Sequence, residues 1–260
     1  MRIDLNCDLG ESFGAYTIGA DEAVMSSISS ANVACGYHGG DPAVMRRTVR
    51  LACAAGVAVG AHPGFPDLAG FGRREMHMAP QDAEDMILYQ IGALAAIARS
   101  EGARLRHVKP HGALYNMAVR DRGLADAIAR AVVSFDPSLI LFALPGSALI
   151  RAGEACGLRI APEGFADRTY EPDGSLTPRS RAGAVIHDPR TVVKRAVRMA
   201  VEGTVLATDG SELAMRVDTI CTHGDTPGAQ ELTRALRTGL ERAGVAIVPV
   251  ASPSASGPPA

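Results

Sequence analysis

Short apolar runs alternate with amphipathic stretches along this chain, and this alternation constrains its fold more than any other feature. The runs have the length of β-strands, and strands are predicted at 3–8, 31–35, 57–62, 105–111, 139–144, 158–163, 183–187, 217–223 and 245–250. Helical patterns lie between most of them, at 42–55, 80–101, 121–134, 145–156, 189–208 and 227–243. Alternating strands and helices are typical of an α/β protein with a mainly parallel sheet.

Polar residues inside the predicted strands favour a closed barrel over an open sheet. With a side-chain period of two, Asn6 and Asp8 share one face of the first run. By the same period His107, Lys109 and His111 share a face. Helices cover both faces of an open doubly wound sheet, so both of its faces are apolar, whereas one polar face suits a barrel interior. We therefore expect a TIM-like (β/α) barrel, and the sequence leaves open whether it is irregular or seven-stranded.

Length and composition fit one such domain and argue against two classes of partner, nucleic acids and membranes. The chain has 260 residues, 47% of them hydrophobic, which predicts a single barrel domain over 1–250 and a disordered, low-complexity tail at 251–260. A net charge of -2 argues against nucleic acid or a membrane as partner. The five cysteines form no CxxC pair, and the chain shows neither a signal-like N-terminus nor a long apolar stretch. These features predict a cytoplasmic protein.

Histidines and acidic residues stand at the ends of several apolar runs. His62 follows VAVGA, His111 follows LRHVKP and His223 follows VDTICT. Asp8 closes IDLNCD, and Glu163 closes LRIAPE. Enzymes built on α/β scaffolds place their active sites at the carboxyl ends of parallel strands. The sequence therefore predicts that these side chains gather at one end of the barrel.

The segments around two histidines share a local design, and a third lies among glycines. In GAHPG and KPHG, His62 and His111 each precede or follow a proline that stiffens the chain, with a glycine beside it. The small residues Ala58 and Gly60 next to His62 predict open space in the barrel interior. In NVACGYHGGDP, glycines around His38 allow the backbone to approach a ligand closely.

The sequence leaves the use of a metal ion open. An aspartate with two or three histidines at strand ends suits Zn²⁺ or a related divalent ion, and the ligands would be Asp8, His62 and His111. The chain has no HxH or HExxH spacing to support such a site. It also has neither GxxxxGK[ST] nor GxGxxG, so a nucleotide would bind in another way.

Six segments resemble the LamB/YcsF family, in order along the chain: DLNCDLGE, NVACGYHGGDP, GAHPGFPD, VKPHGALYN, EGFADRTYEPDGSLTPRSRAGAVI and ICTHGD. The resemblance implies a barrel of the glycoside hydrolase/deacetylase type. It further implies ATP-dependent hydrolysis of 5-oxo-L-proline (pyroglutamate) to L-glutamate, with ADP and phosphate released. Two separately encoded partner subunits, B and C, are implied as well.

This chemistry requires a particular set of groups. A five-membered lactam is an unstrained amide, and phosphorylation of its oxygen by ATP would make the ring carbon open to attack by water. The protein would supply a base for the water and an acid for the departing nitrogen. Asp8 or His62 would be the base, and His111 or His223 would be the acid.

Phosphate or the substrate carboxylate would be held by cations. Lys109 is one candidate, together with Arg168 or Arg179 from the long charged loop at 163–182. The predicted substrate- and phosphate-binding residues are Asn6, Asn32, His38, Lys109, Glu163, Asp167, Arg168 and Arg179.

Two other functions use the same residues. A metal-dependent deacetylase or amidohydrolase, acting alone on a carbohydrate-like substrate, would need the same barrel and the same Asp/His set. A non-catalytic subunit would use the pocket only to bind 5-oxoproline for its partners. Metal content distinguishes the first alternative, and turnover of activated substrate by the isolated chain distinguishes the second.

Overall fold

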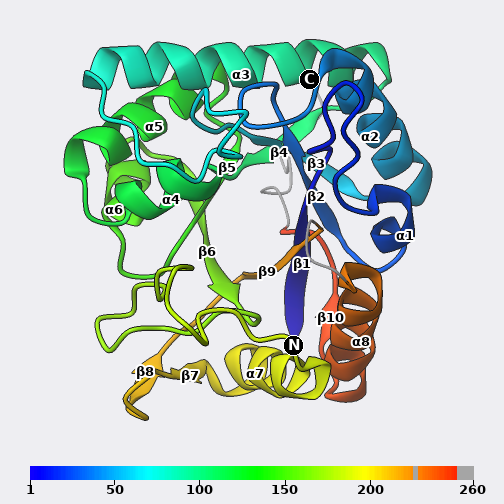
Figure 1. Cartoon of the computed structure of the whole chain (residues 1–260), viewed down its shortest axis with the longest axis vertical. Coiled ribbons are helices and arrows are strands. Elements are labelled where there is room, and N and C mark those ends of the chain that lie inside the picture. Colours follow the sequence, from blue (N-terminus) through cyan, green and yellow to red (C-terminus); the bar gives the residue numbers. More distant parts are fainter. Residues whose placement is uncertain (225–227, 251–260) are drawn as a thin grey trace, which may run out of the picture.

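A computed structural model describes residues 1–224 and 228–250 as a ring of parallel strands surrounded by helices (Figure 1). The ring consists of β1 (Arg2–Leu9), β2 (Ser30–Ala34), β3 (Ala58–His62), β4 (Leu105–Val108), β5 (Ile140–Ala143), β6 (Arg159–Phe165) and β9 (Thr219–His223). It is closed because β1 pairs in parallel with both β2 and β9. A short strand, β10 (Ala246–Ile247), adds to β1 near its start. The predicted TIM-like barrel is confirmed, in its seven-stranded form.

The helices are α1 (Asp21–Met25), α2 (Pro42–Ala55), α3 (Pro80–Ser100), α4 (Gly112–Ala118), α5 (Arg122–Phe135), α6 (Ala148–Ala155), α7 (Pro189–Glu202) and α8 (Ala229–Arg242). Local chemistry sets their ends. Asp41 accepts the backbone N–H groups of the first turn of α2, and Pro42 fills the position that needs no donor. Gly56 ends the same helix in the left-handed conformation (φ 68°). None of the helices described is long and apolar enough to cross a membrane.

The two faces of β1 show how the barrel separates its core from its site. Leu5 and Cys7 point outward into the apolar layer between strands and helices. Asn6 points inward, where its side-chain amide donates to Glu163 Oε1 at 2.9 Å. Asn32 donates in turn to Asn6 Oδ1 at 2.7 Å. The barrel interior is therefore a hydrogen-bonded polar network, as the alternating pattern predicted.

The open space predicted at Ala58 and Gly60 in the barrel interior is not found. A Cβ atom on Gly60 would lie 2.1 Å from His107 Nε2, so the imidazole of His107 fills the space that the glycine leaves. The ring of His107 also stacks on Phe142, with 4.2 Å between the centroids. Gly60 is thus needed for packing inside the barrel, and the cavity lies further along the strands.

The segment 183–187 was predicted as a strand, and this is wrong. Only Val185 forms a bridge there, to Arg168, and Ile186 N–H donates to Asp167 O at 2.8 Å. Its apolar residues cover the loop that follows β6 and do not enter the ring. The predicted helix at 189–208 ends at Glu202, because Gly203 adopts a left-handed conformation (φ 67°).

A hairpin takes the place of the last turns of that predicted helix. It consists of β7 (Thr204–Leu206) and β8 (Glu212–Ala214), paired antiparallel. The predicted strand at 245–250 shrinks to the two residues of β10. The predicted disordered tail at 251–260 and the predicted start of the last helix at 227 lie outside the described residues.

Candidate active site

A cavity of about 950 Å³ opens at the carboxyl ends of the barrel strands. Seven of the residues predicted from the sequence line it: Asp8, His62, Lys109, His111, Arg168, Arg179 and His223. The other five lie outside the described lining of the cavity and are buried: Asn6, Asn32, His38, Glu163 and Asp167. The structure thus divides the predicted set into a wall that a ligand can touch and a supporting layer.

Asp8 and Lys109 form a buried ion pair on this wall. Lys109 Nζ lies 2.5 Å from Asp8 Oδ1, 2.9 Å from Cys221 Sγ and 3.5 Å from Glu163 Oε1. Burial favours the neutral form of Asp8, but its contacts with His62 and with the ammonium of Lys109 outweigh burial and hold the pKa of Asp8 well below its usual value. The carboxylates of Asp8 and Glu163 already compensate the ammonium charge. Lys109 is therefore better suited to position Asp8 than to bind phosphate.

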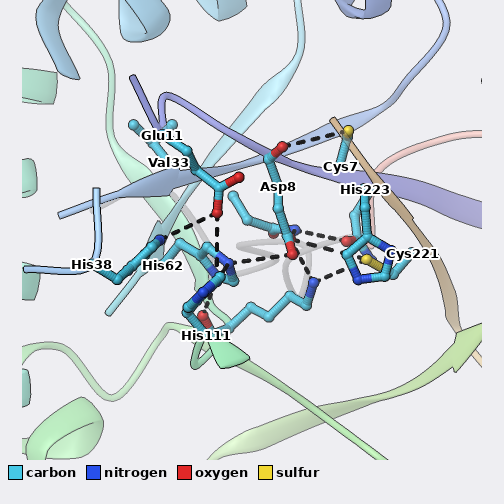
Figure 2. Close-up of polar contacts among 12 residues, drawn as sticks. Cys7, Asp8, Glu11, Val33, His38, His62, His111, Cys221 and His223 are labelled. Atoms are coloured by element: carbon cyan, nitrogen blue, oxygen red, sulfur yellow. Dashed lines mark hydrogen bonds and ion pairs between the residues drawn. The ribbon is translucent and has the colours of Figure 1, made fainter. Parts of the chain in front are cut away.

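Four side chains from different segments form what we call the histidine cluster: Glu11, His38, His62 and His111 (Figure 2). His62 ends β3, His111 precedes α4, and Glu11 and His38 lie in the loops after β1 and β2. His111 Nδ1 lies 2.9 Å from His62 Nε2 and 3.5 Å from Glu11 Oε1. His38 Nε2 lies 3.2 Å from the same Glu11 oxygen. Asp8 Oδ2 borders the cluster, 3.3 Å from His62 Nε2.

His223 and Asp167 form a second pair at the cavity. His223 Nδ1 lies 2.7 Å from Asp167 Oδ2. Because a carboxylate accepts, the hydrogen of the neutral imidazole is on Nδ1, and Nε2 is the ring nitrogen with a lone pair. Burial opposes the charge of Asp167, but His223 outweighs it and lowers the pKa of Asp167. This arrangement fixes the tautomer of a histidine on the cavity wall, as proton-transfer sites require.

The loop after β6 carries two predicted anion-binding arginines, and the structure separates their roles. Arg168 donates from Nε to Ala184 O at 3.1 Å and from Nη2 to Thr177 O at 2.6 Å. Burial lowers the pKa of Arg168 to about 10. Its guanidinium therefore holds the loop together. Arg179 is exposed and lines the same cavity, so it is better placed to reach an anionic ligand.

Three residues outside the predicted set belong to the site. Glu11 lies three positions after Asp8 in the same motif, and its carboxylate turns toward the histidines. Tyr115 stands four residues after His111, which places both on one face of a helical segment, and it lines the cavity. Cys221 lies two positions before His223 and so shares its side of β9. Helix and strand periods would have indicated the last two.

Two groups of described side chains have metal-ligand spacing. One is the histidine cluster, and the other consists of Asp8, Cys221 and His223. In the second group the ammonium of Lys109 already lies against both Asp8 and Cys221, so a further cation would be repelled. The predicted set of Asp8, His62 and His111 is thus divided, with the two histidines grouped with Glu11 and His38.

Comparison with known proteins identifies the family to which the chain is similar. The LamB/YcsF family matches residues 3–255. A protein of Symbiobacterium thermophilum, named as the A subunit of 5-oxoprolinase, is 58% identical over 246 residues, covering 95% of this chain and 94% of that protein. The crystal structure of a lactam utilization protein from Thermus thermophilus superposes with a TM-score of 0.91 at 53% identity, covering 95% and 99% of the two chains.

The barrel is also similar in fold to a carbohydrate esterase. A family 4 carbohydrate esterase from Streptomyces lividans has a TM-score of 0.50 at 10% identity, with 97% of this chain and 94% of that chain covered. At this identity the likeness concerns the fold alone. It agrees with the deacetylase-type barrel that the family resemblance implied.

Proposed function

The chain belongs to the LamB/YcsF family, and from this premise we propose that it is the A subunit of an ATP-dependent 5-oxoprolinase. In the proposed reaction, 5-oxo-L-proline is hydrolysed to L-glutamate while ATP is converted to ADP and phosphate. The name of the relative at 58% identity supports the substrate. The same name describes one subunit of an enzyme, which supports the existence of partners, and we propose that these are the B and C subunits.

The observation that carries a catalytic role is the His223–Asp167 pair on the wall of the cavity. A protein that only bound 5-oxoproline would need hydrogen-bonding groups, but it would not need a histidine whose tautomer is fixed by a buried carboxylate. An oriented imidazole can accept a proton from water and return it to a departing nitrogen. We therefore assign proton transfer to His223, and we prefer it to His111, the other candidate for the acid.

The remaining groups fit the charge that the reaction develops. Ionised Asp8, held by Lys109, supplies a fixed negative charge at the base of the cavity. With its pKa held low, Asp8 is a weak base, so its role is to orient water or substrate N–H groups. Arg179 is exposed on the cavity wall and suits a carboxylate or phosphoryl group.

The test is glutamate release from 5-oxoproline and ATP, measured for the purified chain alone and with the B and C subunits. We expect negligible release by the single chain and sustained release by the complete set. His223→Asn should abolish release by the complete set while the three proteins still assemble. His77→Asn, which changes an exposed histidine, should leave release unchanged.

Three results would contradict parts of this proposal. Vigorous ATP-dependent release by the single chain would remove the need for partners. No release by the complete, assembled set would remove the 5-oxoprolinase assignment itself. Full activity of the His223→Asn variant would transfer the catalytic role to another residue.

A further inference from the structure

Two histidine lone pairs face each other in the histidine cluster. His62 Nδ1 lies 2.7 Å from Lys109 O, and His111 Nε2 lies 2.8 Å from Phe71 O. A carbonyl oxygen can only accept, so these two nitrogens carry the ring hydrogens. The opposite nitrogens, His62 Nε2 and His111 Nδ1, then point lone pairs at each other across 2.9 Å. This contact is repulsive unless something positive lies between them.

A third lone pair converges on the same point. Glu11 Oε1 lies 3.5 Å from His111 Nδ1, and the ligand atoms of the cluster all lie within 4.8 Å of one another. Asp8 Oδ2 also lies 3.3 Å from His62 Nε2, but the carboxylate of Asp8 is already paired with Lys109. A proton can bridge only two such atoms, whereas a metal ion binds all three. With metal–ligand bonds of about 2.0–2.1 Å, the edge of a coordination tetrahedron is about 3.3 Å. The two separations from His111 Nδ1, 2.9 Å to His62 Nε2 and 3.5 Å to Glu11 Oε1, are close to that length. We propose that Glu11, His62 and His111 bind a divalent transition-metal ion, with Zn²⁺ the best match.

His38 supports this site and is not a fourth ligand. Its ring lies parallel to that of His111, with an interplanar angle of 1° and 3.6 Å between the centroids. A lone pair lies in the plane of its ring, so one ion cannot lie in the planes of two parallel rings. His38 Nε2 instead approaches Glu11 Oε1 at 3.2 Å and can donate to it. It thereby orients the carboxylate, as second partners of metal ligands do.

The surrounding backbone is built to hold these rings. Phe71 is the one non-glycine residue with a positive φ (55°) in the described part of the chain, and its carbonyl receives the hydrogen of His111. Such strain persists where the fold imposes it for a purpose. The following Gly72 allows close packing, because a Cβ there would lie 2.7 Å from His38 Cβ and 2.8 Å from His111 Cδ2.

A ligand can reach the proposed ion from one side. His62 and His111 line the cavity beside Asp8, while Glu11 and His38 lie outside its described lining. Three protein ligands with one side open to a cavity are characteristic of catalytic rather than structural zinc sites. The ligand set is a carboxylate and two neutral imidazoles, donors that Zn²⁺ and its neighbours in the first transition row prefer.

The experiment measures binding of the metal alone to the full chain, without substrate or partners. After chelator treatment, the wild-type chain should bind Co²⁺ at one per chain with the visible absorption of a four-coordinate ion, and Zn²⁺ should displace it. Glu11→Gln, His62→Gln and His111→Gln should each weaken binding at least about 100-fold, because each removes a ligand. His38→Gln should weaken it about 10- to 100-fold. The control His77→Gln should bind as the wild type does.

Circular dichroism of each variant shows whether it is folded. If a variant unfolds, the wild-type chain still tests the proposal. Its melting temperature should fall when the metal is removed by a chelator and recover when Zn²⁺ is added. Absence of stoichiometric Co²⁺ and Zn²⁺ binding to the folded wild-type chain would overturn the proposal. Wild-type affinity in a folded His111→Gln variant would overturn it equally, and loss in His38→Gln as complete as in His111→Gln would overturn the ligand set. Failure to hydrolyse 5-oxoproline would leave all these results unchanged.

Discussion

At the scale of single residues, the strongest coupling in this molecule is between Asp8 and Lys109, whose charged atoms lie 2.5 Å apart inside the protein. Removing one partner leaves a buried charge without its main counter-ion. We therefore expect Asp8→Asn and Lys109→Met each to lower the free energy of unfolding by about 3–5 kcal/mol. The double variant should lose at least about 1 kcal/mol less than the sum of the two. Urea denaturation of the four proteins measures this, and simple additivity would show that the pair is not coupled.

Asp4 should make stability depend on pH. Its carboxylate accepts hydrogen bonds from Ser29, Ser30 and Thr219, but burial outweighs them and, with the nearby charge of Glu163, raises the pKa of Asp4 to about 6 from 3.8. The folded state then binds this proton more tightly than the unfolded chain. Its contribution to stability is therefore fully present below about pH 4 and is lost as the pH rises to about 6.

Replacing Asp4 with asparagine tests this sign. The shift corresponds to about 3 kcal/mol across that window. The difference in unfolding free energy between wild type and Asp4→Asn should change by up to that amount between about pH 4 and pH 6, and should be constant above it. Chemical denaturation at a series of pH values provides the data, and parallel profiles for the two proteins would contradict the assignment.

At the scale of elements, the loop after β6 depends on Arg168. Its guanidinium joins two carbonyls, of Thr177 and Ala184, which a lysine ammonium on a flexible stem cannot reproduce with the same geometry. Arg168→Lys should loosen the loop, so we expect faster protease cleavage within 169–184 and a raised KM in the complete enzyme. Arg179→Lys should raise KM without faster cleavage, because Arg179 is exposed on the wall. Equal cleavage rates in both variants would contradict this division of roles.

Elements with strong local signals could be predicted from the sequence. The helices α2 and α7 have an aspartate cap, a proline at the start and a glycine at the end, and their predicted starts are confirmed. The strand predicted at 183–187 was wrong because an apolar run indicates only that its residues are buried. It does not indicate what they pack against, and here they pack on a loop. The strands β7 and β8 have three residues each, too few for a periodic pattern.

The sequence indicates which residues gather at the site, but not which of them line the cavity and which lie behind its wall. Ends of parallel strands must meet, so Asp8, His62 and His223 could be grouped before any contact was known. Which of them touch the cavity depends on register and on loop geometry, which the sequence does not contain. Glu11 could not be placed with His38, because both lie in loops and their contact depends on how two loops fold against each other.

At the scale of the whole molecule, the barrel is closed by strands from near the two ends of the chain. β1 and β9 pair over five residues, from Asp4 with Thr219 to Asp8 with His223, so strands more than 200 positions apart form one wall. The site follows the same rule, since Lys109 from the middle of the chain contacts Asp8 and Cys221 from its two ends. No part of the chain can form the site alone.

This closure predicts that the chain unfolds as a single cooperative unit. Opening any strand pair of a closed ring exposes its polar interior and its apolar outer layer together, so partly open states are costly. Urea unfolding followed by far-ultraviolet circular dichroism, which reports helices, should coincide with unfolding followed by tyrosine fluorescence. Of the five tyrosines, Tyr115 and Tyr170 are buried near the cavity and its loop and should respond most to unfolding, whereas Tyr89 on α3 is already exposed. The helices α3 and α5 lie on the outside of the ring (Figure 1). Two separated transitions would contradict the prediction of one barrel domain over 1–250, because they would show that part of the chain can stay folded after the ring has opened.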